Sequence, residues 1–175
     1  ECHSHGHAGL GVHPGSGSQR PLIRNCRLEH NQIGLFWCWG VKYGLAEHNR
    51  MIGNSNYGIS IGHNDTDNVM RHNEVIDSGK VGILFRDDSR GQDFWANRNI
   101  VDQNRIVNSG GPDGVAIDVQ GRTRDITLTG NTIIEERAPE QRTGIRLGAA
   151  VGQVAMSGNE LSGFAQNMID LRSDS

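Results

Sequence analysis

Lysine is almost absent from this 175-residue chain, which contains only Lys42 and Lys80, so arginine carries most of the positive charge. The formal net charge is −3 at pH 7, and the lack of a basic excess argues against nucleic acid as a main partner. The chain also lacks any run of the roughly 18 apolar residues that a membrane-spanning helix needs. Its length fits one domain or two small ones.

Cysteine is scarce as well, with only Cys2, Cys26 and Cys38. An odd number of cysteines excludes a complete disulfide framework and leaves at least one thiol free. We interpret Cys26 and Cys38 as small buried hydrophobic residues rather than as catalytic groups.

Glycine and asparagine are abundant, with 24 glycines and 15 asparagines, whereas glycine normally makes up ~7% of residues. The glycines are periodic, because one of them precedes an apolar-x-apolar triplet in each of six segments. These six are Gly9, Gly34, Gly58, Gly82, Gly114 and Gly144, and Asn167 begins a degenerate seventh copy. The steps between copies are 25, 24, 24, 32, 30 and 23 residues.

Asparagines form a second marker with a similar period. They are Asn25, Asn49, Asn73, Asn104, Asn131 and Asn159, with steps of 24, 24, 31, 27 and 28 residues. An apolar residue stands three positions before each of them, and apolar residues follow most of them at two and three positions. Two markers that stay in phase over six copies predict an internal repeat.

A repeat of about 24 residues with short apolar triplets fits a parallel β-solenoid. Helical repeats need about 33 residues, propeller blades need about 40, and leucine-rich repeats need a leucine-dense consensus that is missing here. In a solenoid each coil supplies about three short strands, which stack in parallel about 4.8 Å apart. Stacking also lets buried asparagines hydrogen-bond to one another in a column. We therefore predict an all-β, single-domain fold of six to seven coils.

The pattern N-x-[apolar]-[apolar]-x(n)-G-[ILV]-x-[apolar] resembles the right-handed parallel β-helix repeat of the pectate-lyase-like superfamily, over about residues 9–171. The segments GVHPGSGSQRP, GISIGHNDTDN and GVAIDVQG are similar to stretches of uncharacterised bacterial secreted β-helix proteins. The resemblance implies a group that includes pectate lyases, polygalacturonases, other glycoside hydrolases, alginate lyases, uronate epimerases, phage tailspikes and binding modules. It also implies an extracellular or periplasmic location, which the chain itself does not reveal.

The sequence begins in mid-pattern at Glu1, without an initiator methionine or the apolar core of a signal peptide. We therefore expect residues 1–8 to be a partial N-terminal coil or a truncation scar, and residues 9–175 to be the β-helix domain of a longer protein. Because solenoid ends need a cover, self-association through uncapped ends is an alternative.

Extra residues in two coils predict projecting loops, which often lie on the binding side of a solenoid. They fall between Phe85 and Asn104, at Asn108–Asp113 and at Glu135–Thr143. We interpret the last of these as a solvated surface.

Counting from the marker glycines predicts which side chains of different coils meet. Positions +1 and +3 point inward and positions +2 and +4 point outward, so residues at +4 to +7 gather at the ends of stacked strands. The polar and aromatic residues gathered in this way are His13, Trp39, His63, Asp65, Arg86, Asp87, Asp88 and Asp118. A polymer lying along the solenoid axis would cross them in order.

These residue types suit a polysaccharide, especially an acidic one. Carboxylates roughly 5–10 Å apart serve glycosidic hydrolysis, and crowding raises the pKa of one of them toward neutrality. A histidine can act as the base of a lyase or epimerase, while arginine neutralises a uronate. We therefore assign Asp87, Asp88, Asp118 and His63 to proton transfer, and Trp39, Arg86, His13 and Asp65 to substrate binding. A competing interpretation is that the aspartates only form turns.

Two metal sites are also conceivable from residue types. A carboxylate cluster could bind Ca²⁺. Alternation in an extended strand would place His3, His5 and His7 on one face, where they suit Zn²⁺ or Cu²⁺, although no carboxylate follows at ligand spacing.

The sequence therefore leaves two hypotheses. The first is a polysaccharide lyase, hydrolase or epimerase that acts along the outward face of the glycine-led sheet. The second is a non-catalytic carbohydrate-binding or structural β-solenoid module.

Overall fold

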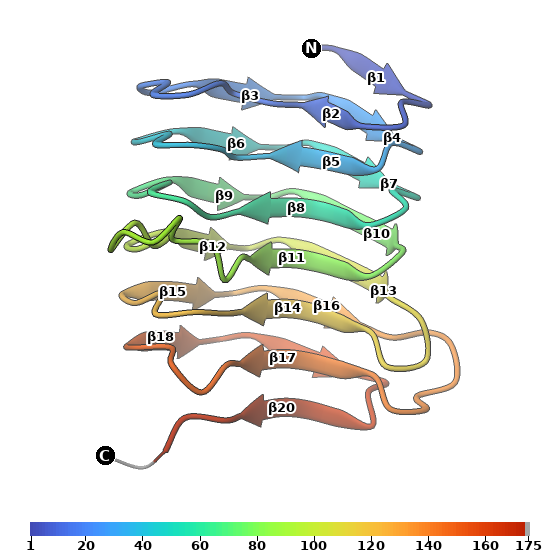
Figure 1. Ribbon diagram of the computed structural model, residues 1–175. Helices are drawn as coiled ribbons and strands as arrows, with labels where there is room; N and C mark the ends of the chain where they lie inside the picture. The colour runs from blue at the N-terminus through green and yellow to red at the C-terminus, as the bar shows by residue number, and fades with distance from the viewer. Residues whose placement is uncertain (174–175) are drawn as a thin grey trace.

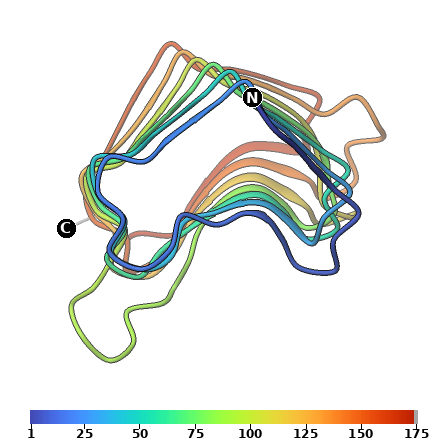
Figure 2. The ribbon, with the colours of Figure 1, turned by 90° about the horizontal axis from the view of Figure 1, so that it is seen from above.

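The computed structural model describes residues 1–173, in which twenty β-strands are joined by turns and loops. The strands wind around one axis, and three strands complete each full coil (Figure 1). Viewed along that axis, successive coils lie over one another around a common interior (Figure 2). The predicted all-β parallel solenoid is thus confirmed. The described residues include no helix long and apolar enough to cross a membrane.

The strands form three parallel sheets. Sheet 1 contains β1 (His3–His5), β4 (Arg27–Glu29), β7 (Arg50–Ile52), β10 (Glu74–Ser78), β13 (Arg105–Ser109), β16 (Thr132–Ile134) and β19 (Glu160–Ser162). Sheet 2 contains β2 (Leu10–Val12), β5 (Ile33–Phe36), β8 (Tyr57–Ile61), β11 (Val81–Phe85), β14 (Val115–Val119), β17 (Thr143–Leu147) and β20 (Gln166–Asp170). Sheet 3 contains β3 (Leu22–Arg24), β6 (Leu45–Glu47), β9 (Val69–Arg71), β12 (Ile100–Asp102), β15 (Ile126–Thr129) and β18 (Val154–Ser157).

Each strand pairs in parallel with the equivalent strand of the coils before and after it. In sheet 2, the register of β8 and β11 places Gly58 beside Gly82. At the start of sheet 1, the register of β7 and β10 places Asn49 beside Asn73. In these coils one marker glycine therefore lies over the next, and one marker asparagine lies over the next, as winding around a single axis requires.

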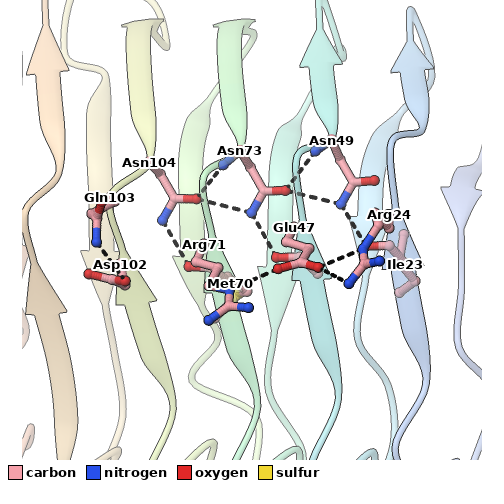
Figure 3. A network of polar contacts seen from close by, with 11 residues as sticks. Ile23, Arg24, Glu47, Asn49, Met70, Arg71, Asn73, Asp102, Gln103 and Asn104 are labelled. Atoms are coloured by element: carbon pink, nitrogen blue, oxygen red, sulfur yellow. Dashed lines mark hydrogen bonds and ion pairs between the residues drawn. The ribbon is translucent and has the colours of Figure 1, made fainter.

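The asparagine column is a continuous hydrogen-bonded ladder. The Oδ1 atom of Asn73 accepts the backbone N–H and the side-chain amide of Asn49, both at 3.0 Å. Its own Nδ2 donates to the Ala46 carbonyl and to Oδ1 of Asn104, again at 3.0 Å (Figure 3). The same pattern continues from Asn104 to Asn131. Each amide thus satisfies buried backbone groups that would otherwise have no partner.

At its N-terminal end the ladder contains Cys26, so the assignment of Asn25 to this column is wrong. The backbone N–H of Cys26 donates to Oδ1 of Asn49 at 3.0 Å. Asn25 lies one position earlier, with φ of 55°, and His48 and His72 occupy the same corner with φ of 55° and 52°. Asparagine tolerates this left-handed conformation. The spacing of asparagines in the sequence could not distinguish the ladder column from the column one residue earlier, because asparagine is tolerated in both.

We number the coils by their strands of sheet 2, so that coil one contains β2, coil three β8, coil four β11 and coil five β14. In coil five the glycine marker is displaced by two residues from the expected column. Ala116, and not Gly114, lies beside Gly82 of coil four. Asp118 consequently lies beside Leu84 on the outer face of sheet 2. The expected columns fail here because the longer connection before β14 contains a glycine of its own.

The same displacement occurs in coil one, where Gly11 and not Gly9 lies beside Gly34. His13 is therefore next to Phe36, and the two rings meet edge to face with their centroids 5.3 Å apart.

Inward-facing side chains fill the solenoid with one apolar core. Leu35, Ile59, Ile83 and Ile117 form a fully buried column from sheet 2. Trp37, directly after β5, is also fully buried in this core. Burial of such columns is the main stabilising contribution in the fold, and it leaves the outer face of sheet 2 free for polar chemistry.

Two insertions project beyond the outline that the other coils share. The loop between β11 and β12 is the yellow-green excursion in Figure 2, and the loop between β16 and β17 is the orange one. The interpretation of the second loop as a solvated surface is wrong for Glu135 and Arg142, which are 4% and 6% exposed. The Glu135 carboxylate tolerates burial because it forms ion pairs with Arg137 at 2.7 Å and with Arg142 at 3.7 Å.

Gly79 gives a direct test of coil packing. A Cβ at this position would lie 2.1 Å from the backbone carbonyl oxygen of Ser55, so the two coils would have to move apart. We expect Gly79→Ala to lower the free energy of unfolding by roughly 2–4 kcal/mol, measured by urea denaturation. Gly15→Ala is the matched control, because a Cβ there meets no atom within 4 Å. Equal stabilities of the two variants would contradict the close approach.

Candidate functional site

Five predicted site residues meet at the corner that leads from sheet 2 to sheet 3. Trp39 follows β5, His63 and Asp65 follow β8, and Arg86 and Asp88 follow β11; we refer to these five as the corner cluster. The turns stack through backbone hydrogen bonds. The N–H of Gly40 donates to the carbonyl of His63 at 3.1 Å, and the N–H of His63 donates to the carbonyl of Asp88 at 3.2 Å. Stacking thus brings together side chains that are far apart in sequence.

His63 lies between two aromatic rings. It stacks on Trp39 with ring centroids 4.6 Å apart and on Phe94 of the insertion loop with centroids 6.3 Å apart. His63 is only 2% exposed, whereas Trp39 and Phe94 are 50% and 40% exposed. The corner therefore offers two solvent-facing aromatic side chains with an imidazole between them.

The environment of His63 favours the neutral form of its imidazole. Burial lowers its pKa below the usual 6.5, while the Asp88 carboxylate acts in the opposite direction. Oδ2 of Asp88 lies 3.8 Å from Nδ1 of His63, and Nδ1 is buried with no hydrogen-bond partner within residues 1–173. A neutral imidazole beside a carboxylate can accept a proton, because the carboxylate stabilises the cation that forms.

Asp65 is fully buried and faces the backbone. It accepts the N–H of Val41 at 2.9 Å and the N–H of Gly62 at 3.1 Å. Burial raises the pKa of Asp65 to about 7, although these N–H groups and Arg86 lower it. Its carboxylate therefore ties the turn after β8 to the preceding coil.

Arg86 lies along the outer face of sheet 2 and reaches across two coils. It donates to Oγ of Ser60 at 2.8 Å and to the carbonyl of Trp37 at 3.0 Å, and its guanidinium lies 4.4 Å from the ring centre of Phe36. Nη2 also approaches Oδ2 of Asp65 at 3.8 Å. Arg86 therefore has internal partners and holds the corner together.

The pKa of Asp65 predicts a pH dependence of stability. Its pKa is near 7 in the folded chain and about 3.9 in the unfolded chain, so the folded state holds the proton more tightly. The resulting stability is present below about pH 4 and is lost as the pH rises through 7. The stability of wild type relative to Asp65→Asn should therefore fall between about pH 4 and pH 7 and stay constant at higher pH, measured by urea denaturation. A constant difference would show that Asp65 is not titrating in this range.

Three other predicted residues lie outside the corner cluster. His13 points to the corner from coil one, with Nε2 2.6 Å from the Cys38 carbonyl oxygen. Asp87 is exposed and faces coil five, since its Oδ1 would lie 2.8 Å from a Cβ on Gly121. Asp118 is only 3% exposed, and its contacts go elsewhere on sheet 2.

Asp118 forms a bidentate ion pair with Arg146 of the next coil. Nε of Arg146 donates to Oδ1 at 3.1 Å, and Nη2 donates to Oδ2 at 2.5 Å. Gln120 also donates to Oδ1. The register shift in coil five explains why Asp118 joins this pair and does not join Asp88.

Within residues 1–173, no three His, Cys, Asp or Glu side chains are arranged to hold a metal ion. In the N-terminal histidine run, Nε2 of His3 instead lies 3.1 Å from Oε2 of Glu29. The rings of His3 and His5 are 4.6 Å apart. The suggested Zn²⁺, Cu²⁺ and Ca²⁺ sites thus have no ready ligand set in this arrangement.

Sequence reasoning missed Phe94, which forms one wall of the corner. The signal was the aromatic pair Phe94 and Trp95 inside an otherwise polar insertion. Repeat counting could not use it, because an insertion has no equivalent in the other coils and its return to coil three depends on tertiary packing.

Residues 1–133 match the family described as the right handed beta helix region. The chain belongs to this family. No curated protein sequence matches this β-helix significantly.

Two solved structures share the fold of this β-helix. They are the crystal structures of the periplasmic alginate epimerase AlgG and of a mutant of that protein, with 16% and 15% sequence identity. The TM-score is 0.61 in both cases, and each match covers 91% of this chain and 42% of the other. The chain thus spans less than half the length of these neighbours, and at this identity the likeness shows the fold alone.

Proposed function

We propose that this β-helix acts on an acidic polysaccharide at the corner cluster. The observation that carries the proposal is the stack in which the exposed rings of Trp39 and Phe94 enclose the buried imidazole of His63, with the Asp88 carboxylate beside it. Exposed aromatic rings offer apolar faces on which a sugar can stack. A neutral imidazole at the same place supplies a base, so binding and proton transfer would share one site.

The reaction class that fits is removal of the proton next to a uronate carboxylate. His63 would take that proton, and Asp88 would stabilise the imidazolium. Arg90 is exposed and forms an ion pair with Asp88 at 3.3 Å. Its guanidinium has further donors, with which it would neutralise the substrate carboxylate beside Asp88 in place of the internally bonded Arg86. In a lyase, the bond between the neighbouring carbon and the glycosidic oxygen would then break as the double bond forms, and the leaving oxygen would take the proton from the His63 imidazolium. In an epimerase, a water on the opposite face would return a proton to the same carbon, and His63 would release its own proton to solvent.

Access to His63 depends on its aromatic neighbours. The ring is 2% exposed, so a sugar reaches it only when Trp39 or Phe94 moves aside. Phe94 belongs to the insertion loop, which makes a small loop movement the natural entry step.

The comparisons support this proposal in a general way. A periplasmic alginate epimerase has this fold, which favours a polysaccharide substrate and a location outside the cytoplasm. The acidic substrate of this chain and its lyase or epimerase reaction are part of the proposal.

A non-catalytic carbohydrate-binding or structural solenoid is the second candidate. It is favoured because charged side chains at the predicted site already have partners within the protein. Asp118 forms an ion pair with Arg146, and Arg86 donates hydrogen bonds to Ser60 and Trp37. In that case Trp39 and Phe94 would bind sugar without chemistry.

A panel of uronic-acid polymers tests the proposal. Alginate, polygalacturonate and a glucuronate polymer would be assayed for unsaturated product by ultraviolet absorbance, for new reducing ends, and for inverted sugar residues by proton NMR. We expect turnover of at least one polymer. Binding without turnover would support the second candidate, and neither binding nor turnover would contradict both.

A further inference from the structure

We propose that a second pocket, beside the corner cluster, is a subsite for a carboxylate-bearing sugar residue of the same polymer. This inference rests on the proposed function. The pocket lies between the insertion loop after β11 and the turn after β14, and we call it the loop pocket. Its polar and aromatic lining residues are Ser89, Gln92, Asp93, Trp95, Arg122 and Arg124. Its volume of about 700 Å³ is in the range of ligand sites, roughly 300–1,000 Å³.

The loop pocket is held in place by packing between coils. Trp95 is 9% exposed, and its ring lies so close to Gly121 that a Cβ there would be 2.2 Å from Cζ3. The backbone N–H of Arg124 donates to Oδ1 of Asn97 at 3.0 Å, and that of Arg98 donates to the Arg124 carbonyl at 3.1 Å. The loop is therefore anchored on coil five, and the pocket exists before a ligand binds.

The charges in the loop pocket favour an anion. Arg122 forms no ion pair with any described residue, and Arg124 makes only loose contacts with Asp93 at 3.7 Å and Asp125 at 4.0 Å. The lining therefore has two guanidinium groups and one carboxylate. A guanidinium matches a carboxylate with two parallel hydrogen bonds, which fits a uronate better than a neutral sugar.

Other side chains of the lining can bind the hydroxyl groups of a sugar. Ser89 and Gln92 offer polar groups in the loop pocket, and Trp95 contributes an aromatic side chain.

The insertion loop connects the loop pocket to the corner cluster. Phe94 stacks against His63 of coil three, while the next residue, Trp95, packs on Gly121 of coil five. The two contacts are two coil steps apart, which is about 10 Å along the axis. A polymer that follows the axis past the loop would reach both places with residues of one chain.

Binding of hexasaccharides tests the subsite. The probes are oligogalacturonate and oligomannuronate hexamers and their carboxyl-reduced counterparts, with affinities measured by calorimetry. The variants are compared in a His63→Gln background, so that the hexamer is not consumed. Arg122→Gln should weaken binding of a uronate hexamer by about tenfold and leave binding of the reduced hexamer unchanged. Arg105→Gln is the control, because Arg105 is also exposed and has no ion pair among the described residues.

The results separate failure of the subsite from failure of the proposed function. If the His63→Gln chain binds a uronate hexamer and the chain that also carries Arg122→Gln binds it equally well, the subsite is wrong and the proposed function stands. An equal loss for the charged and reduced hexamers would also overturn recognition of a carboxylate. If neither the His63→Gln chain nor the wild-type chain binds or turns over any uronate hexamer, the proposed function fails and the subsite fails with it.

An NMR measurement locates the subsite without using affinity. The indole N–H resonance of Trp95, assigned through Trp95→Phe, should shift when methyl glucuronoside is added. The Trp37 indole, which is fully buried in the core, should not shift. A Trp95 signal that stays unchanged at saturating hexamer would contradict ligand binding at this pocket.

Discussion

Replacing His63 by glutamine is expected to reduce turnover of the polyuronate substrate by about 10²–10⁴-fold, the usual contribution of a general base. Glutamine keeps a polar side chain in the stack between Trp39 and Phe94 but cannot take up a proton. The measurement is kcat/KM on whichever polymer of the panel is turned over, with the melting temperature as a check of folding.

His72→Gln is a matched control for this variant. Both histidines have a positive φ, 40° at His63 and 52° at His72, so both substitutions carry a similar backbone cost. His72 stacks on His48 at another corner, with ring centroids 5.1 Å apart. Activity should be near wild type in His72→Gln. Full activity in His63→Gln would remove the histidine from the mechanism.

The pH profile separates a base from a merely structural histidine. Because burial lowers the pKa of His63 below 6.5, the acid limb of kcat/KM should lie below pH 6.5. Asp88 raises this pKa, so Asp88→Asn should move the acid limb to still lower pH. An acid limb that does not move in Asp88→Asn would argue that another group titrates.

Asn73→Ala is expected to lower the free energy of unfolding by roughly 3–5 kcal/mol. The substitution removes the acceptor of the buried Asn49 N–H and the donor to the Ala46 carbonyl, and it breaks the link to Asn104. Buried backbone groups without partners cost more than the average hydrogen bond contributes, and no water fills an apolar interior to replace them. Urea denaturation followed by circular dichroism measures the loss.

Two other asparagines calibrate this result. Asn56→Ala should change stability little, because the described residues offer its side chain no hydrogen bond and it is only partly buried. Asn159→Ala should fall in between, since Asn159 is only part-buried and ends the ladder. Similar losses for Asn56 and Asn73 would mean that the ladder contributes little.

Periodicity predicted the coils but not every register. The 24-residue steps from Gly34 to Gly58 and Gly82 gave the correct stacking of sheet 2. The prediction failed at Gly114, where a longer connection changed the count by two and separated Asp118 from Asp88. A count along the chain fails wherever an insertion precedes a strand, because pairing is decided by the fit of apolar side chains to the core.

The order of apolar, glycine and asparagine positions by itself determined that this chain winds into a parallel solenoid, since each repeat can bury its apolar face only against another copy. Tertiary structure alone decided that Phe94 returns to cover His63, that Trp95 anchors on Gly121, and that Asp118 is neutralised by Arg146. These contacts join side chains that share no period. Their formation depends on where an irregular loop or a neighbouring coil places each side chain in space, and no local pattern records that position.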